Sequence, residues 1–225
     1  MFRSKYSNFL TIVLIVAIVF VVALVGVLGV SAYKRYKNDK EAENAISNFE
    51  NNIEQNTDTN TSGGANFIEQ NIVTNTTTED TTSQEGTRQV TYYNNFVMIG
   101  YIEIPKIGIK YPILEKETVA SLEQSVAVRY PDNPNLNQPG NVVIAGHNYR
   151  NGQFFSKLEN VATGDVIKIT DVDGQTLVYT VYEKYETTPE DVAYITRNVG
   201  ENTEITLVTC TDDSNARIIV KARAQ

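Results

Sequence analysis

Residues 205–223 read ITLVTCTDDSNARIIVKAR, two apolar runs rich in β-branched residues on either side of six turn-forming residues. This pattern predicts two antiparallel strands joined by a short connection. If Ile205–Cys210 pairs with Arg217–Arg223 across Thr211–Ala216, then Cys210 and Arg217 stand directly opposite each other. Directly opposed residues share a sheet face, with Cβ atoms about 4.5–5.5 Å apart, whereas a slip of one residue would send them to opposite faces. In this register, the only thiol of the chain lies beside a guanidinium.

The rest of the chain from about residue 91 has the same texture of short apolar runs separated by turn residues. Seven or eight short strands with only minor helices predict an all-β closed barrel or a sandwich. A short helix is expected over residues 118–124. An Asp-Gly pair at 173–174 is a strong signal for a hairpin turn. The further strand segments are Ile99–Ile104, Ile107–Leu114, Val142–Ala145, Asp165–Thr170 and Leu177–Tyr185.

Few residues in this chain could carry chemistry. A single cysteine excludes internal disulfides and multi-cysteine zinc sites, and a single histidine excludes His-rich metal centres. A cation beside Cys210 would favour the thiolate, and His147, which follows Gly146 at the end of a predicted strand, could shuttle protons. Each residue also has a plain interpretation: a buried thiol, a surface imidazole and a solvated Arg217. The residues alone leave both interpretations open and identify no substrate.

The N-terminal part contains a candidate membrane helix. Phe9–Val30 is 22 residues long and has no charged side chain. As a helix it would reach about 33 Å, enough to cross a hydrocarbon core of about 30 Å. A cleaved signal peptide ending near Val30-Ser31-Ala32 is the alternative, but the apolar part of a signal peptide usually has about 7–15 residues. We therefore expect an uncleaved signal anchor. Basic residues flank both ends, with a slight excess on the C-terminal side, so their count weakly favours a cytoplasmic C-terminal side.

Residues 41–87 have a different composition. They carry nine acidic residues, no Lys or Arg, and runs of Asn and Thr. Such a segment buries too little apolar surface to offset the entropy lost on ordering, so we expect a disordered tether. Residues Lys34 to Ile53, which include the first part of this segment, could extend the membrane helix as a short charged stem. The net charge of the chain is −8, and its acidic outer part argues against nucleic acid as a partner.

Several motifs together resemble the sortases, the cysteine transpeptidases of Gram-positive cell surfaces. The sequence TLVTC at 206–210, followed by Arg217 in ARIIVKA, resembles the sortase signature. AGHN at 145–148 resembles the histidine motif of that family, and IPKIGI at 104–109 resembles its opening strands. The resemblance extends from about Tyr92 to the end of the chain. It implies a closed eight-stranded sortase-type β-barrel with short helices, preceded by one transmembrane helix.

The resemblance also implies a division of the chain. We expect a cytoplasmic tail over residues 1–8, the membrane anchor over 9–30, a stem and disordered linker over 31–90, and the catalytic domain over 91–225. In the family the catalytic domain faces outward, which overrides the ambiguous count of basic residues. The expected location is therefore the cell membrane, with a single span and an extracellular catalytic domain.

The chemistry implied by the resemblance falls on three residues. Cys210 would attack the Thr–Gly carbonyl of a sorting signal similar to Leu-Pro-x-Thr-Gly and form a thioester. His147 would protonate the leaving amine and later deprotonate the incoming one, and Arg217 would hold the substrate carbonyl and its oxyanion. The implied partners are surface proteins with such a signal and an amine nucleophile, such as a peptidoglycan precursor or a pilin lysine. No cofactor and no obligatory metal are expected, and no substrate-binding residue is assigned.

Class A is the most similar sortase class. Some class A relatives bind calcium through acidic residues near the substrate groove, and Glu186, Glu190 and Asp191 could serve here, although a solvated loop is the favoured interpretation. Two other functions remain open. One is a membrane-tethered surface module that binds a partner without catalysis, and the other is a cysteine peptidase that releases its product to water.

Overall fold

The computed structural model describes residues 3–59 and 90–225. It divides after Ala42 into two units, of which the second contains the β-barrel. Half of the predicted stem and linker, residues 60–89, lies outside the described residues. The elements are α1 (Arg3–Thr59), β1 (Thr91–Tyr93), β2 (Phe96–Ile104), η1 (Pro105–Ile107), β3 (Ile109–Leu114), α2 (Val119–Leu122), β4 (Val126–Tyr130), β5 (Gly140–Ala145), η2 (Leu158–Asn160), β6 (Val166–Asp171), β7 (Thr176–Thr187), β8 (Thr203–Cys210) and β9 (Arg217–Ala224).

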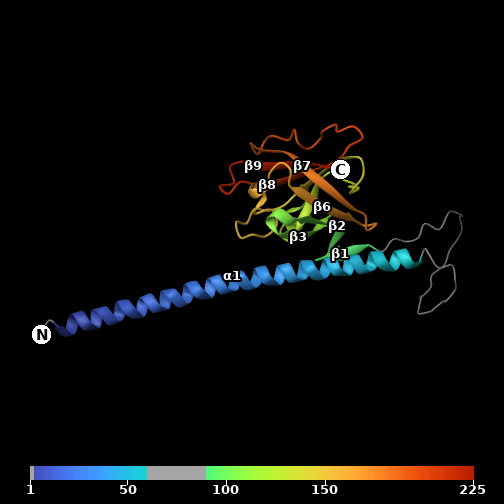
Figure 1. Cartoon of the computed structure of the whole chain (residues 1–225). Coiled ribbons are helices and arrows are strands. Elements are labelled where there is room, and N and C mark those ends of the chain that lie inside the picture. The colour runs from blue at the N-terminus through green and yellow to red at the C-terminus, as the bar shows by residue number, and fades with distance from the viewer. Residues whose placement is uncertain (1–2, 60–89) are drawn as a thin grey trace, which may run out of the picture. The chain divides into compact units, whose positions relative to one another are not determined.

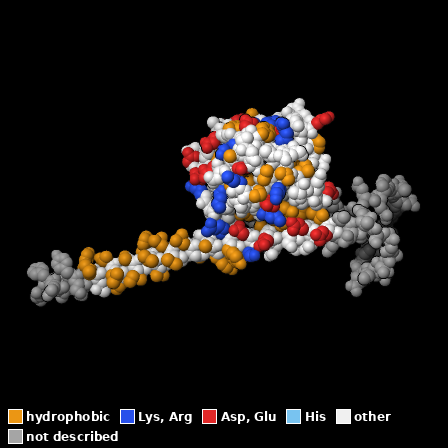
Figure 2. Space-filling model, in the orientation of Figure 1, with side chains coloured by type: hydrophobic (Ala, Val, Ile, Leu, Met, Phe, Trp, Pro, Cys, Tyr) orange, Lys and Arg blue, Asp and Glu red, His pale blue; other side chains and the backbone are white. Residues whose placement is uncertain are grey.

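The first unit consists of the N-terminal part of α1. The predicted membrane segment Phe9–Val30 is helical throughout, and its large apolar side chains are exposed. Figure 2 shows them as a continuous apolar covering of this part of the helix. In the described part of the chain, this is the one helix that is long and apolar enough to cross a membrane.

The second unit is a closed barrel of eight strands (Figure 1). Neighbouring strands follow the order β2–β3–β4–β5–β8–β9–β7–β6, and β6 pairs with β2 to close the ring. The pairs β3–β4 and β5–β8 are parallel and the others are antiparallel. The short strand β1 adds to β2 outside this ring. The prediction of a closed eight-stranded barrel is therefore confirmed.

Closure of the barrel depends on a glycine in β2. Gly100 pairs with Ile113 of β3 on one side and with Asp171 of β6 on the other. A Cβ atom at this position would overlap the carbonyl oxygen of Thr170 and approach Leu136 Cδ1 to 2.7 Å. Only glycine therefore lets β6 come close enough to complete the ring.

Several strand predictions differ from the structure. The short strand β1, Thr91–Tyr93, is not among the expected segments, and β2 begins at Phe96 and not at Ile99. The strand expected from Ile107 begins at Ile109, because Pro105–Ile107 forms a 3-10 turn that ends at Gly108 in the left-handed region, with φ +66°. Strand β4, Val126–Tyr130, was not among the expected segments. It is only five residues long and forms just two register pairs with β3. Its first three residues are buried in succession, so the alternation that marks a half-buried strand is missing.

The helix also continues further than its composition predicts. It includes the proposed stem, Lys34–Ile53, which agrees with the helical alternative, and it runs on to Thr59, where disorder was expected. The reason is packing between distant segments: Ile46, Phe49 and Ile53 recur at helical spacing and pack against Tyr93 and Met98 of the barrel. Within this unit Glu50 pairs with Lys110 at 3.3 Å. The average composition of this acidic segment does not reveal that three of its apolar residues share one helical face.

Phe49 provides a test of this packing. Its side chain is 2% exposed and meets Tyr101 edge to face, with 6.3 Å between the ring centroids. Replacing Phe49 by alanine leaves a cavity, so we expect the variant to lose about 3–5 kcal/mol in the free energy of unfolding of the barrel unit. Denaturant unfolding of the full chain in detergent measures this loss. Tyr92→Ala, at a 62% exposed aromatic residue, is the control and should change stability little; equal effects of the two variants would contradict the packing.

Candidate active site

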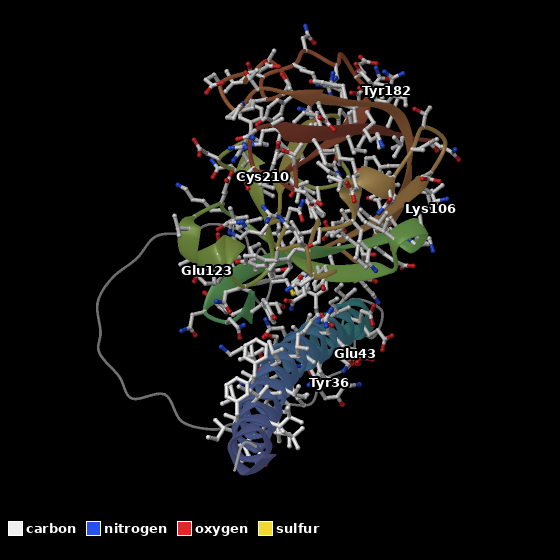
Figure 3. All side chains as sticks on the ribbon, turned by 90° about the vertical axis from the view of Figure 1, so that its left-hand side faces the viewer. Tyr36, Glu43, Lys106, Glu123, Tyr182 and Cys210 are labelled. Carbon is white, nitrogen blue, oxygen red and sulfur yellow. The ribbon has the colours of Figure 1, made fainter. Side chains whose placement is uncertain are left out.

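The β8–β9 hairpin places two of the three predicted site residues side by side. The ladder runs from Glu204↔Arg223 through Val208↔Ile219 to Cys210↔Arg217 without a register shift. The register predicted from the sequence is therefore confirmed. Cys210 is a free thiol, and both it and Arg217 are half-buried. Figure 3 labels Cys210 among the side chains of the barrel. Cys210 therefore lies on the same sheet face as Arg217, at a strand end that is partly exposed.

The connection Thr211–Ala216 is held by its own hydrogen bonds. The backbone N–H of Thr211 donates to Ala216 O at 3.0 Å, and the N–H of Ala216 donates to Thr211 Oγ1 at 3.1 Å. Thr211 Oγ1 also donates to Asp213 at 2.6 Å, and that carboxylate accepts the N–H of Asn215. These bonds lower the pKa of Asp213, with the Thr211 hydroxyl as the largest cause. The connection therefore ends the two strands at a defined place, immediately beyond Cys210 and Arg217.

His147 reaches the same end of the sheet from β5. Strands β5 and β8 are parallel, with Ala145 opposite Val208, and the N–H of Gly146 continues the ladder to Val208 O at 3.1 Å. Thr209 Oγ1 donates to Gly146 O at 2.7 Å in the buried interior. Continuing this register by two residues brings His147 level with Cys210. The imidazole is half-buried.

Gly146 is required by close packing. An added Cβ atom would lie 2.7 Å from Phe155 Cδ2 and 2.9 Å from Val126 Cγ1, closer than such atoms approach in proteins. The glycine therefore allows the chain to leave β5 against buried side chains and to present His147 at the rim.

Asn148 links the histidine segment to the cysteine strand. Its Nδ2 donates to Cys210 O at 3.0 Å and to Asp212 Oδ1 at 2.9 Å. Its Oδ1 accepts the N–H of Arg150, which has φ +56°. In the sequence, Asn148 is recognisable only as part of the motif at 145–148. Its role as a bridge between the two segments could not be read from spacing, because it depends on which end of β8 meets the end of β5.

The surface around Cys210 is formed by one face of β8. Alternate residues of a strand share a face, so Cys210 lies on the same face as Val208. Val208 packs with Ala145, Ile219 and Tyr194 in an apolar cluster. Tyr194 belongs to the β7–β8 connection, which therefore covers this face up to the rim where the thiol is exposed.

An ion pair fixes Tyr194 in place. Arg129 forms two parallel hydrogen bonds with Glu117, at 2.6 and 2.7 Å, and donates to the hydroxyl of Tyr194 at 2.7 Å. The hydrogen bonds that Arg129 donates to Glu117 raise the pKa of Arg129, which keeps the guanidinium charged. The β7–β8 connection is thus attached to β4 at one point.

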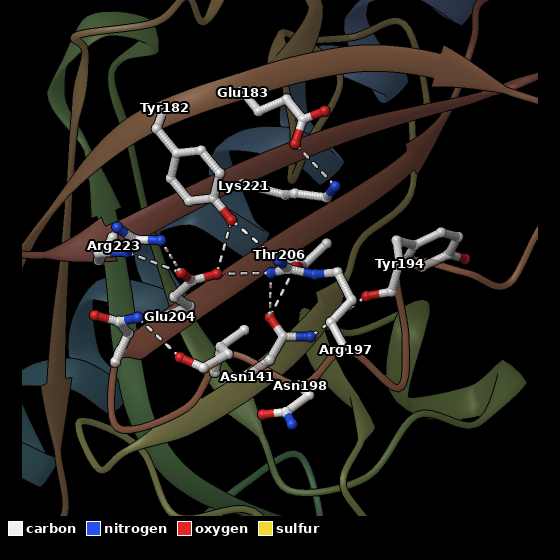
Figure 4. Close-up of polar contacts among 12 residues, drawn as sticks. Asn141, Tyr182, Glu183, Tyr194, Arg197, Asn198, Glu204, Thr206, Lys221 and Arg223 are labelled. Carbon is white, nitrogen blue, oxygen red and sulfur yellow. Dashed lines mark hydrogen bonds and ion pairs between the residues drawn. The ribbon is translucent and has the colours of Figure 1, made fainter.

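A second set of polar contacts attaches the same connection to the other end of β8 (Figure 4). The carboxylate of Glu204 is 1% exposed and accepts bonds from Arg197 at 2.9 Å, Arg223 at 2.8 Å and the hydroxyl of Tyr182 at 2.7 Å. Burial alone would raise the pKa of Glu204, but the bonds from Tyr182 and the two arginines outweigh it and hold the pKa below its ordinary value. Arg197, in the β7–β8 connection, also donates to Asn141 of β5 at 3.1 Å.

Glu204 makes stability depend on pH. Because its pKa is lower in the folded chain than in the unfolded chain, its contribution is present above the unfolded pKa of about 4.3 and is lost as the pH falls through the folded pKa. Glu204→Gln should lower the free energy of unfolding at pH 7 by about 2–3 kcal/mol, less than for a fully buried pair because Arg223 is half exposed. It should also reduce the loss of stability below pH 5.

Denaturant unfolding between pH 3 and 7 measures both effects. The matched control is Glu183→Gln, because the carboxylate of Glu183 pairs with Lys221 but is 47% exposed. Equal pH profiles for wild type and Glu204→Gln would contradict the assignment.

The acidic residues considered as calcium ligands are otherwise engaged or exposed. Asp191 accepts a hydrogen bond from Thr187 Oγ1 at 2.5 Å and one from the N–H of Ala193 at 2.9 Å, and these lower its pKa. Glu186 and Glu190 are exposed. Among residues 3–59 and 90–225, no group of three or more His, Cys, Asp or Glu side chains has an arrangement that could hold a metal ion.

The family model described as the sortase domain matches residues 102–225, which is β2 from Ile102 onward and the rest of the barrel. The chain belongs to the sortase family. The matched segment contains His147, Cys210 and Arg217.

Curated relatives support the same family. Sortase A of Streptococcus agalactiae serotype III (strain NEM316) is 30% identical over 141 residues, which are 60% of this chain and 56% of that protein. Sortase A of Staphylococcus aureus (strain NCTC 8325 / PS 47) is 31% identical over 121 residues, 52% of this chain and 57% of that protein. The chain therefore spans little more than half the length of these relatives.

Solved structures agree with the barrel topology. A Clostridium perfringens sortase D5 transpeptidase has a TM-score of 0.52 at 32% identity, covering 57% of this chain and 79% of its own. Sortase A from Corynebacterium diphtheriae has a TM-score of 0.53 at 30% identity, covering 58% and 61%. Because these relatives are sortases of more than one class, the assignment to class A stays a prediction.

Proposed function

We propose that this sortase is a cysteine transpeptidase that cuts a sorting signal similar to Leu-Pro-x-Thr-Gly and joins the released acyl part to an amine. The observation that carries the proposal is the meeting of a half-buried thiol, a guanidinium and the segment bearing the only imidazole at one end of β5, β8 and β9. Family membership supports the choice of reaction.

The first half of the reaction uses Cys210 and His147. The thiol of Cys210 gives its proton to His147 as the sulfur attacks the carbonyl carbon of the substrate threonine, and the carbonyl oxygen becomes an oxyanion. The Thr–Gly bond then breaks as His147 gives a proton to the leaving glycine nitrogen, which leaves a thioester on Cys210. General acid–base transfer of this kind contributes about 10²–10⁴ in rate.

Arg217 is the proposed donor to the oxyanion. Its cross-strand position opposite Cys210 supports this role, because a permanently charged fork there would lie near the carbon that the sulfur attacks. One guanidinium N–H donates to Ala216 O at 3.1 Å, which holds the side chain at the strand end. The remaining N–H groups can donate to the substrate carbonyl.

The second half reverses the first with a new amine. His147 removes a proton from the amine, the amine nitrogen attacks the thioester carbon, and the carbon–sulfur bond breaks as His147 passes that proton to the sulfur and restores the thiol. A peptide bond is formed, so the energy of the original bond is conserved. The proposed amines belong to a cell-wall precursor or a pilin lysine. Attack by water instead would make the protein a cysteine peptidase.

The proposed setting is the outer face of the cell membrane. The apolar segment 9–30 would be the span, residues 1–8 the cytoplasmic tail, 31–90 the stem and linker, and 91–225 the catalytic domain. The substrates would then be membrane-bound or newly secreted surface proteins, presented on the side of the membrane where cell-wall amines are found.

A product assay tests the choice between transfer and hydrolysis. The full chain in detergent is incubated with a peptide containing Leu-Pro-x-Thr-Gly, with and without oligoglycine or a lysine-containing peptide. We expect the amide of the added amine to replace the hydrolysed acid as the main product in mass spectra. Hydrolysed acid at the same yield in the presence of every amine would favour the peptidase instead.

Substitutions test the assigned roles. Cys210→Ala should abolish turnover and leave the circular dichroism spectrum and the unfolding transition unchanged. Arg217→Ala should lower kcat/KM about 10²–10³-fold, the effect of one lost oxyanion donor. The control for loss of charge is Lys168→Ala, which removes a cation of β6 that pairs with Glu103 of β2 at 3.7 Å. Near-normal kcat/KM for Arg217→Ala would contradict the role of Arg217.

A further inference from the structure

The imidazole of His147 has an unusual set of contacts for a proposed proton shuttle. Catalytic histidines paired with a nucleophile are commonly oriented by a third, polar group. Among residues 3–59 and 90–225, no side chain forms a hydrogen bond or an ion pair with this imidazole. Its ring contact is with Tyr149, with 4.8 Å between the ring centroids and an angle of 31° between the planes.

Tyr149 is 43% exposed, and its ring packs on one buried aromatic ring. Its ring centroid lies 5.8 Å from that of Phe154, which in turn meets Tyr111 at 5.2 Å in an edge arrangement. Phe154 is 1% exposed and Tyr111 is 6% exposed, so these two rings are fixed by the core. These contacts form a continuous row of four rings, from Tyr111 and Phe154 in the barrel interior to Tyr149 and His147 at the rim.

The backbone around Tyr149 is equally constrained. Asn148 forms a β-bridge with Phe154, and the N–H of Tyr149 donates to Ser156 Oγ at 3.1 Å. The carbonyl of His147 accepts the N–H of Phe155 at 3.2 Å. The segment folds back on itself, which fixes Tyr149 beside the imidazole two residues before it.

We propose that Tyr149 is the positioning residue of His147, in the place that a polar group has in many cysteine and serine enzymes. The inference rests on the proposed function and explains what orients the imidazole. A tilted ring packed against the imidazole limits its rotation and occupies neither of its nitrogens. Both nitrogens stay free, one to exchange a proton at the substrate and the other to meet water.

The test begins with the contact itself. Because the chain has a single histidine, its imidazole protons can be assigned without ambiguity in NMR spectra of the full chain in detergent micelles. We expect nuclear Overhauser contacts between the His147 and Tyr149 rings in the wild type. The ring current of tyrosine should also displace the imidazole signals, and Tyr149→Leu should remove that displacement whereas Tyr149→Phe should keep it. Absence of the contact in the wild type would overturn the inference without any variant.

Kinetics test the consequence. Tyr149→Leu should lower kcat about 2- to 10-fold, the range that corresponds to the loss of one aromatic pair, and should leave KM unchanged. Tyr149→Phe should restore kcat, because it keeps the ring and removes only the hydroxyl. Tyr92→Leu, at an exposed tyrosine of β1, is the matched control and should behave as the wild type.

The outcomes separate this inference from the proposed function. An active wild type with equal kcat for Tyr149→Leu would overturn the positioning role and leave the transpeptidase intact. A loss of kcat in Tyr149→Phe equal to that in Tyr149→Leu would assign the effect to the hydroxyl and overturn stacking as the cause. A wild type that forms no thioester and no amide adduct would refute the proposed function, and the positioning role with it, even where the ring contact is present.

Discussion

The hydrogen-bonded register of β8 with its two neighbours is the constraint on which the site depends. On one side the antiparallel ladder with β9 sets Cys210 opposite Arg217, and on the other the parallel ladder with β5 ends level with Gly146. A shift of one residue in either ladder would turn the affected side chain to the opposite face. Residues that are 63 to 70 positions apart in the sequence thus converge through backbone hydrogen bonds, before any side-chain contact contributes.

The burial of β8 on both faces protects this register. Between its half-buried ends every residue from Glu204 to Thr209 is buried, against the barrel interior on one face and the β7–β8 connection on the other. The carboxylate of Glu204 with its two arginines fixes one end of the strand, and Arg129 holds Tyr194 over its middle. Slippage would separate buried charges from their partners, which is strongly unfavourable. The polar contacts far from the thiol therefore maintain the geometry around it.

The sequence predicted the parts of the fold that follow from local patterns. The hairpin that opposes Cys210 and Arg217, and the closed barrel, were predicted from alternation, turn residues and family motifs. Packing between distant segments was not predicted. Phe49 is helical and buried because it packs on the barrel, whereas the acidic composition of the surrounding segment predicts disorder. Similarly, Tyr149 is one of thirteen tyrosines in the sequence, and only the fold shows which one meets the imidazole. The short strand β4 lacked alternation because it is buried throughout its first half.

The most direct test of the account is whether substrate becomes attached to Cys210. The full chain is mixed with a Leu-Pro-x-Thr-Gly peptide in the absence of any amine, quenched in acid during turnover, and digested for peptide mass spectrometry. The account predicts the acyl part of the peptide on the fragment that contains Cys210, in a bond that hydroxylamine cleaves. Consumption of the peptide while Cys210 remains unmodified at every time point would contradict it.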